Sequence, residues 1–282
     1  MNIYEQFNWD KKAIKTAVKE HWEADPCESR AGRGVDNETL FFEKIDNYRY
    51  EKSPYIPGFA KFEEGKNKRV LEVGLGSCSD FIKWARNGAI LWGIDLTQAS
   101  VNLAKKRLDL EKMHATVKIG DVEALDFEDN FFDIVYSYGV VHHTPDTPQA
   151  IREIHRVLKP GGTARIMIYH EGGLSWIYEW FLFGLLKGQP WKSRREIVFY
   201  HNESLGTKIY TKAEAEELFE GFQRTNIITV VSASDVMDIQ LSEKYQKVWL
   251  FRNMQRCMRF LKYLRPFIPA TLGSFLLIEA EK

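Results

Sequence analysis

Short apolar runs alternate with helix-like segments from residue 69 to residue 169, and this alternation constrains the fold more than any other feature. Five runs have the length and composition of buried strands: residues 69–73, 89–95, 115–120, 133–138 and 163–169. Three segments between them have helical character: residues 79–86, 97–108 and 147–158. Strands that are apolar throughout are typical of parallel sheets whose crossover helices cover both faces. We therefore predict an α/β, doubly wound, mostly parallel sheet.

The helix boundaries carry their own signals. Asn87 and Gly88 form a C-cap pair that ends the first helix, and Thr97 is an N-cap residue for the second. Residues 159–162, with the sequence Lys-Pro-Gly-Gly, end the third helix before the fifth strand begins.

The bulk composition restricts the functional class. Of 282 residues, 44% are hydrophobic and 28% are charged, which is ordinary for a globular protein. Lys plus Arg and Asp plus Glu both number 39, and this zero balance argues against a dedicated nucleic-acid-binding protein. The three cysteines are scattered with no CxxC pair, so we expect neither a metal site nor a disulfide framework. The N-terminal residues lack the pattern of a signal peptide, and we expect a cytoplasmic protein.

The turn after the first strand holds the first chemical signal. Glu72, Gly74 and Gly76 lie between this strand and the following helix. Glycines let the backbone approach a ligand closely, and the helix N-terminus favours negative charge. A nucleotide-binding turn and a tight turn without any ligand both fit this motif alone.

The tips of the next two strands carry carboxylates. Asp95 ends the second strand, with Leu96 beside it, and is placed to accept both hydroxyls of an adenosine ribose. Its alternative role is to cap the helix that begins after Thr97. Asp121 and Val122 follow the third strand, where a carboxylate can accept the adenine amino group and an apolar side chain can pack on the ring.

Two ligands remain at this point, a nicotinamide dinucleotide and S-adenosylmethionine. A dinucleotide site normally has a third glycine that makes room for the pyrophosphate, but Cys78 and Ser79 stand at that place. The ligand without phosphates is therefore favoured.

In this order, the motifs resemble those of the class I S-adenosylmethionine-dependent methyltransferases. The resemblance is to the broad family of quinone-biosynthesis and small-molecule methyltransferases, and it covers about residues 66 to 170. It is carried by five motifs: residues 70–76, 93–95, 120–121, 132–135 and 152–162. Family membership implies a Rossmann-like seven-stranded sheet of order 3-2-1-4-5-7-6, with residues 226–231 and 275–280 as strands six and seven.

The resemblance also implies roles for individual residues. Glu72 and the turn from Gly74 to Gly76 would hold the methionine end of S-adenosylmethionine, Asp95 the ribose and Asp121 with Val122 the adenine. Cys78 stands where the family usually has glycine, which would narrow the methionine pocket or lower cofactor affinity.

The acceptor side should lie just past the fourth strand, where ligands bind in open α/β sheets. We expect Ser137 and Tyr138 to contact the cofactor, although Tyr138 could reach the acceptor instead. His142 and His143 follow, and a histidine of near-neutral pKa suits a catalytic base. The alternative is a structural role in holding this loop. A metal site at the pair lacks a third ligand at suitable spacing.

Segments outside the alternating region would shape the acceptor pocket. We expect an N-terminal cap over residues 1–65, with Tyr48, Tyr50 and Tyr55 as possible wall residues. The methyltransferase domain would then span residues 66–282, with a helical lid inserted at about residues 171–210. The apolar residues 174–186 predict a buried helix, with a dimer face or peripheral membrane contact as alternatives.

A basic segment comes last. Residues 241–265 predict an amphipathic helix with seven basic residues, of which Arg252, Arg256 and Arg259 share one face. A solvated face explains this pattern, and so would contact with an anionic substrate or lipid head groups. We favour internal neutralisation by glutamates of the preceding helix: Glu214, Glu216, Glu217 and Glu220.

The sequence therefore predicts methyl transfer from S-adenosylmethionine to an O, N or C nucleophile of a small molecule, by a monomer or homodimer that binds no nucleic acid. Two alternatives remain, a nicotinamide-dependent oxidoreductase and a non-catalytic S-adenosylmethionine-binding protein.

Overall fold

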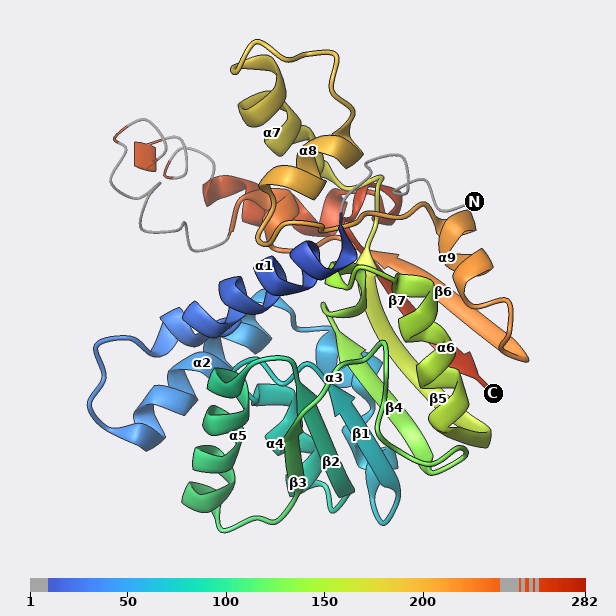
Figure 1. Cartoon of the computed structure of the whole chain (residues 1–282). Helices are drawn as coiled ribbons and strands as arrows, with labels where there is room; N and C mark the ends of the chain where they lie inside the picture. The colour runs from blue at the N-terminus through green and yellow to red at the C-terminus, as the bar shows by residue number, and fades with distance from the viewer. Residues whose placement is uncertain (1–9, 239–248, 250–251, 254–255, 257–258) are drawn as a thin grey trace.

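The computed structural model describes residues 10–238, 249, 252–253, 256 and 259–282, and it contains one mixed seven-stranded sheet. The strands lie in the order β3-β2-β1-β4-β5-β7-β6, which confirms the predicted fold and order (Figure 1). Their bounds are β1 Arg69–Val73, β2 Ile90–Asp95, β3 Thr116–Ile119, β4 Phe132–Tyr138, β5 Leu158–Tyr169, β6 Arg224–Val230 and β7 Phe275–Glu281.

Strands β1 to β5 run parallel, and β7 is inserted antiparallel between β5 and β6. The pairing of β7 with β5 runs from Thr163 opposite Glu281 to Tyr169 opposite Phe275. Strands β5 and β7 are therefore each hydrogen-bonded on two sides, and both are long and apolar, which fits their burial.

Helices cover both faces of the sheet. The bounds are α1 Lys11–Ala24, α2 Glu38–Lys52, α3 Ile56–Ala60, α4 Ser79–Arg86, α5 Gln98–Glu111, α6 Thr147–Val157, α7 Leu174–Glu179, α8 Arg194–His201 and α9 Lys212–Leu218. Thr97 caps α5 as predicted, its side chain accepting a hydrogen bond from the amide of Ser100. Helix α6 ends at Val157, and β5 already begins at Leu158, so the predicted Lys-Pro-Gly-Gly break is the first part of the strand. A register shift against β4 accommodates it.

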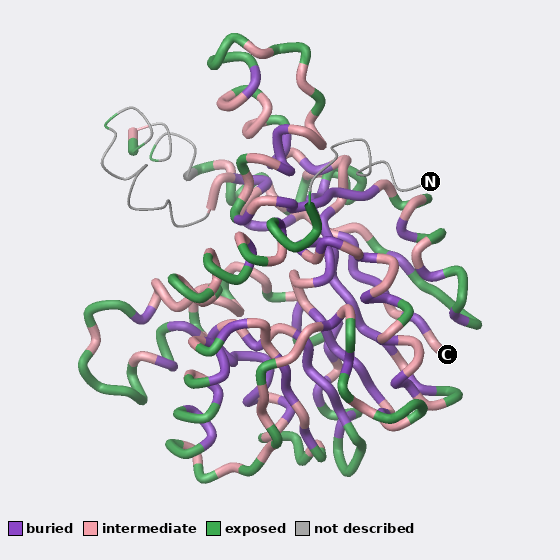
Figure 2. Tube along the Cα trace, in the orientation of Figure 1, coloured by how far each residue is buried: buried purple, intermediate pink, exposed green. Residues whose placement is uncertain are grey.

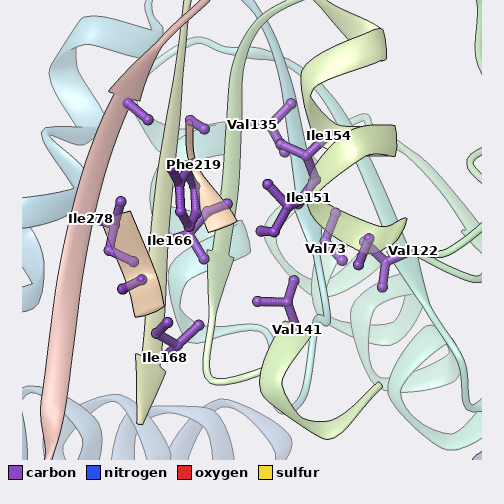
Figure 3. Packing of buried hydrophobic residues seen from close by; sticks show 14 of the residues in the cluster. Val73, Val122, Val135, Val141, Ile151, Ile154, Ile166, Ile168, Phe219 and Ile278 are labelled. Carbon is purple, nitrogen blue, oxygen red and sulfur yellow. The ribbon is translucent and has the colours of Figure 1, made fainter. Parts of the chain in front are cut away.

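Two apolar layers hold the sheet between its helices. Val70 and Leu71 are neighbours on β1, yet they belong to opposite layers because strand side chains alternate in direction. One layer packs α6 and α9 onto the sheet, as Ile154, Ile166 and Phe219 show in Figure 3. The other packs α3, α4 and α5. Figure 2 shows the consequence: the inner strands are buried along most of their length, whereas the edge strands β3 and β6 and the solvent sides of the outer helices are exposed.

Helix α1 lies over the sheet, and α7 and α8 lie above α1 in the view of Figure 1. The first residues of α7 are held by a buried carboxylate, because Asp235 accepts hydrogen bonds from the hydroxyls of Ser175, Ser232 and Ser274. Backbone amides of the same three serines also donate to Asp235. This network ties the segment after β5 to the loops at the ends of β6 and β7.

The expectation of a wholly buried helix at residues 174–186 is wrong in part. Helix α7 continues as a π-helix over Trp180–Leu185, and Ile177, Phe181 and Leu185 are each nearly half exposed along one side. The other side, with Trp176, is buried. None of the helices in the described parts of the chain is both long and apolar enough to cross a membrane.

The predicted basic helix at residues 241–265 lies mostly outside the described residues. Its described end is a 3-10 helix over Arg259–Phe267, where Pro266 interrupts the backbone donors that an α-helix needs.

Candidate active site

One cavity of about 730 Å³ opens at the carboxyl ends of β1, β2 and β4, a volume usual for small-molecule sites. Its wall comes from the sheet, from α1 and α2 of the N-terminal segment, and from α7, α8 and the following loop. Of the residues predicted to bind cofactor, eight line it: Glu72, Gly74, Gly76, Asp95, Leu96, Asp121, Val122 and Tyr138. Ser137 does not line it, since its side chain is wholly buried within β4.

The turn after β1 requires glycine at Gly74. Its φ of +80° is in the left-handed region, and an added Cβ would lie 2.1 Å from Val140 in the loop after β4. The turn can therefore approach that loop only without a side chain, which sets the floor of the cavity between β1 and β4.

Cys78 occupies the third position of the glycine turn. Its φ of +70° is one that an L-residue adopts at a cost of roughly 1–2 kcal/mol, which explains why glycine suits this place. The thiol is buried and lies 3.9 Å from the carbonyl oxygen of Ser100 on α5. The side chain therefore packs toward α5.

Glu72 lies at the bottom of the cavity with only 3% of its surface exposed. Its Oε2 has no hydrogen-bond partner among the described residues. Burial and the nearby carboxylate of Asp80 raise the pKa of Glu72 well above its usual value, although Arg49 opposes this effect. A buried acceptor without a donor is costly, so Glu72 is suited to receive a cationic or N–H group of a ligand.

Asp95 links β2 to the glycine turn. Its Oδ2 accepts hydrogen bonds from the amides of Leu75 at 2.8 Å and Gly76 at 3.3 Å. Its Oδ1 accepts from the amide and hydroxyl of Thr97. The carboxylate thus lines the cavity and holds Thr97, which is the N-cap of α5, while its contact with a ribose stays a prediction.

Asp121 is paired with a residue that the sequence patterns did not single out. Lys15 of α1 contacts Asp121 Oδ2 at 2.6 Å and Glu123 Oε2 at 2.5 Å. All three side chains are partly buried, and Lys15 also lines the cavity. This bridge holds α1 across the tip of β3, where the resemblance places the adenine.

The two histidines are in different environments. His142 is fully buried, does not line the cavity, and packs its ring 3.9 Å from that of Tyr169. Burial lowers the pKa of His142 well below its ordinary value, and the neighbouring His143 and Lys208 add to the effect. His143 is also buried but lines the cavity. Geometry therefore favours His143 over His142 as the base.

Hydrogen bonds orient the ring of His143. Its Nδ1 lies 3.1 Å from the hydroxyl oxygen of Thr207 and 3.2 Å from that of Ser204. Its Nε2 lies 3.4 Å from Oε2 of Glu203. Two hydroxyls on one side and a carboxylate on the other therefore hold the imidazole at the cavity wall.

Glu203 belongs to the loop after α8 and lines the cavity. Its Oε2 also accepts a hydrogen bond from the hydroxyl of Tyr169 at 2.9 Å. Burial by itself would raise the pKa of Glu203, but His143 and Tyr169 outweigh it and hold this pKa below the ordinary value. A carboxylate kept charged in this place stabilises an imidazolium on His143.

Residues 71–166 match the family model described as a methyltransferase domain. The match contains the glycine turn, the carboxylates at the three strand tips and both histidines. The chain contains a class I S-adenosylmethionine-dependent methyltransferase domain.

Curated relatives share this domain. Phosphoethanolamine N-methyltransferase 2 of Caenorhabditis elegans is 35% identical over 124 residues, 43% of this chain and 28% of the relative. Ubiquinone biosynthesis O-methyltransferase of Coxiella burnetii is 30% identical over 113 residues, 40% of this chain and 48% of the relative. The chain thus covers half or less of the length of either relative.

Solved structures agree on the fold over nearly the whole chain. Geranyl diphosphate C-methyltransferase from Streptomyces coelicolor aligns with a TM-score of 0.58 at 13% identity, covering 95% of this chain and 97% of that one. An S-adenosylmethionine-dependent methyltransferase from Mesorhizobium loti aligns with a TM-score of 0.52 at 16% identity, covering 81% and 97%. At these identities the likeness shows the fold alone.

The cavity contains residues that motif analysis missed. Besides Lys15 and Glu203, the cavity is lined by Arg49, which pairs with Asp80 and Glu28. Of the three tyrosines expected in the wall, Tyr48 lines the cavity. The other two act behind the wall: Tyr50 donates to Asp80, and the hydroxyl of Tyr55 lies 3.0 Å from that of Tyr138.

Proposed function

We propose that this chain transfers the methyl group of S-adenosylmethionine to an O, N or C nucleophile of a small molecule. One observation carries the proposal: a single cavity runs from the strand tips that suit an adenosyl ligand to the pair of His143 and Glu203. A cofactor and an acceptor can therefore meet within it.

The cavity suits S-adenosylmethionine better than a dinucleotide. Glu72, Asp95 and Asp121 surround the turn with carboxylates, which favour an amino group and a sulfonium and disfavour phosphates. The amides of Leu75 and Gly76, which a pyrophosphate would need, already donate to Asp95. In this proposal Glu72 and the glycine turn hold the methionine end, Asp95 the ribose, and Asp121, Val122 and Leu96 the adenine.

The bound cofactor supplies an electrophilic methyl carbon. The protein aligns the acceptor nucleophile with this carbon, excludes water from the cavity and provides a base. Nε2 of His143 accepts the proton of the acceptor, and Glu203 stabilises the imidazolium that results. Residues 1–65 serve as a cap and residues 171–210 as a lid, since α1, α2, α7 and α8 all contribute to the cavity wall. Tyr138 lies between the cap and β7 and can contact either ligand.

The matched variants His143→Gln and His142→Gln test this role. Formation of S-adenosylhomocysteine is measured with three acceptors of similar size that carry an amine, a phenol or an acidic carbon. We expect His143→Gln to lower turnover of the accepted compound by about 100-fold or more and to leave S-adenosylhomocysteine affinity unchanged. His142→Gln should retain turnover per folded molecule, with the folded fraction determined by circular dichroism.

Two results would contradict the proposal. Calorimetry that detects no binding of S-adenosylhomocysteine would remove the cofactor assignment. Equal loss of turnover in both variants would remove the distinction between the histidines.

A further inference from the structure

We propose that the acceptor is a small organic amine that enters as its ammonium ion, held by Glu179 and Glu203 against an aromatic wall. This inference rests on the proposed methyl transfer and specifies the acceptor for the same cavity. It comes from the side of the cavity that faces α7 and the loop after α8.

The wall on this side is a connected series of aromatic rings. Tyr169 stacks on Phe275 with ring centroids 5.4 Å apart. The ring centroid of Trp176 lies 5.0 Å from that of Tyr169. Tyr138 meets the edge of Phe275 at 6.3 Å. The side chains of all four line the cavity. Aromatic faces carry negative quadrupole density and attract organic cations.

Two hydrogen-bond acceptors in this region lack donors. Glu179 Oε1 accepts a hydrogen bond from Asn202, but Glu179 Oε2 and Asn202 Oδ1 are buried without a partner among the described residues. Both residues line the cavity. Buried acceptors are normally satisfied, so a ligand rich in N–H donors fits this place.

One of these two acceptors belongs to a carboxyl group, and Glu203 is a second carboxylate on this side. Burial, together with the charge of Glu203, raises the pKa of Glu179 to about 8, so a cation bound beside it would favour its ionised form. The cavity also has cationic side chains on the α2 side, but Arg49 pairs with Asp80 and Glu28, and Lys52 pairs with Asp238. None of the ion pairs found among the described residues gives Glu179 a cationic partner, so a cationic ligand would complete the site.

The proposed reaction consists of one proton transfer to His143 and one methyl transfer to the amine nitrogen. The ammonium gives a proton to Nε2 of His143, and the nitrogen lone pair then forms the bond to the methyl carbon. The bond between that carbon and the sulfonium sulfur breaks, and its electron pair stays on sulfur. The products are the N-methylated ammonium, S-adenosylhomocysteine and a proton carried by His143.

The test compares 2-phenylethylamine with 2-phenylethanol, which is nearly the same shape but neutral. Calorimetry on full-length protein saturated with S-adenosylhomocysteine measures the affinity for each. We expect the amine to bind at least tenfold more tightly, and Glu179→Gln to abolish this preference. Glu196→Gln on α8, which does not line the cavity, is the matched control and should keep it. With S-adenosylmethionine, mass spectrometry should detect N-methyl-2-phenylethylamine.

The outcomes separate this inference from the proposed function. Protein that binds no S-adenosylhomocysteine would refute methyl transfer itself. Protein that binds it, yet holds the alcohol as tightly as the amine, would overturn the ammonium site alone. The wild-type comparison decides this even if Glu179→Gln does not fold.

Discussion

Glu72, Asp95 and Asp121 stand at the tips of three neighbouring strands, and each carboxylate has different surroundings. Glu72 is buried with a free acceptor atom, Asp95 is held by four donors of the chain, and Asp121 is bridged by Lys15. Acidic residues at equivalent positions are therefore suited to different parts of the proposed cofactor: Glu72 to its amino group, Asp95 to its ribose and Asp121 to its adenine.

Asp95→Ala should weaken S-adenosylhomocysteine binding by about 2 kcal/mol or more, roughly 30-fold in Kd, because charge-assisted hydrogen bonds to the ribose are lost. Loosening of the turn, whose amides lose their acceptor, adds to the effect. Calorimetry measures the affinity, and Asp109→Ala on the exposed side of α5 is the control. Unchanged affinity in Asp95→Ala would exclude the ribose role.

Glu179 makes stability depend on pH. Burial raises its pKa from 4.5 to about 8, and the charge of Glu203 adds to this while the hydrogen bond from Asn202 opposes it. Between these two values the folded state binds more protons than the unfolded state, so the contribution of Glu179 to stability falls as pH rises. Relative to wild type, Glu179→Gln should gain free energy of unfolding from pH 5 to pH 8.

Urea unfolding of wild type, Glu179→Gln and Glu196→Gln at pH 5, 6.5 and 8 measures this trend. A difference between wild type and Glu179→Gln that does not change with pH would show that Glu179 is ordinarily ionised in the folded protein.

Helix α1 closes the cavity with few buried contacts. Ile14 and Val18 are the buried residues of the helix, and the partly buried Trp22 packs against the same apolar layer. The other attachments include the ion pairs of Lys15 with Asp121 and of Lys11 with Asp146. Elements held by few apolar contacts open at low free-energy cost, so α1 is suited to admit and release a cofactor. Helix α8 differs, because three consecutive residues, Ile197, Val198 and Phe199, are buried, and the last two belong to the apolar layers of the sheet.

Lys15→Glu should therefore speed the release of S-adenosylhomocysteine by roughly five- to tenfold, corresponding to about 1 kcal/mol, because it replaces an attraction to Asp121 and Glu123 with repulsion. Stopped-flow fluorescence measures the rate. Lys19→Glu makes the same charge change on the exposed side of α1 and should leave the rate unchanged. Identical rates in both variants would show that the bridge does not hold the helix closed.

Two segments far apart in sequence meet over the sheet in the molecule as a whole. One precedes β1 and the other lies between β5 and β6, yet both line one cavity with the strand tips. Binding of a ligand that contacts all three should stabilise the folded protein as a unit.

S-adenosylhomocysteine at about 100 times its Kd should add about 2.7 kcal/mol to the free energy of unfolding and raise Tm by several degrees. NADH at the same concentration should leave Tm unchanged, because the turn amides are already bound to Asp95. Calorimetric melting curves measure both shifts. A rise with NADH alone would support the oxidoreductase alternative.

The sequence by itself determined the alternation of strands and helices and the residues at the strand tips, because these depend on local patterns: apolar runs, glycine turns and caps. The order of the strands was implied by the resemblance of these motifs to a known family, and the structure has the same order. The β5 boundary was missed because the glycines after Lys159 fit a bulged strand start as well as a turn. The tertiary structure decided which residues face the cavity.

His142 and His143 are adjacent in sequence, and both rings are buried. Packing places the ring of His142 against Tyr169 and the ring of His143 beside Glu203. Lys15 reaches Asp121 across 106 positions, and Glu179 at the end of α7 meets Asn202 across 23 positions. Contacts of this kind form when distant segments meet over the sheet. They cannot be predicted from the residues that neighbour each partner in sequence.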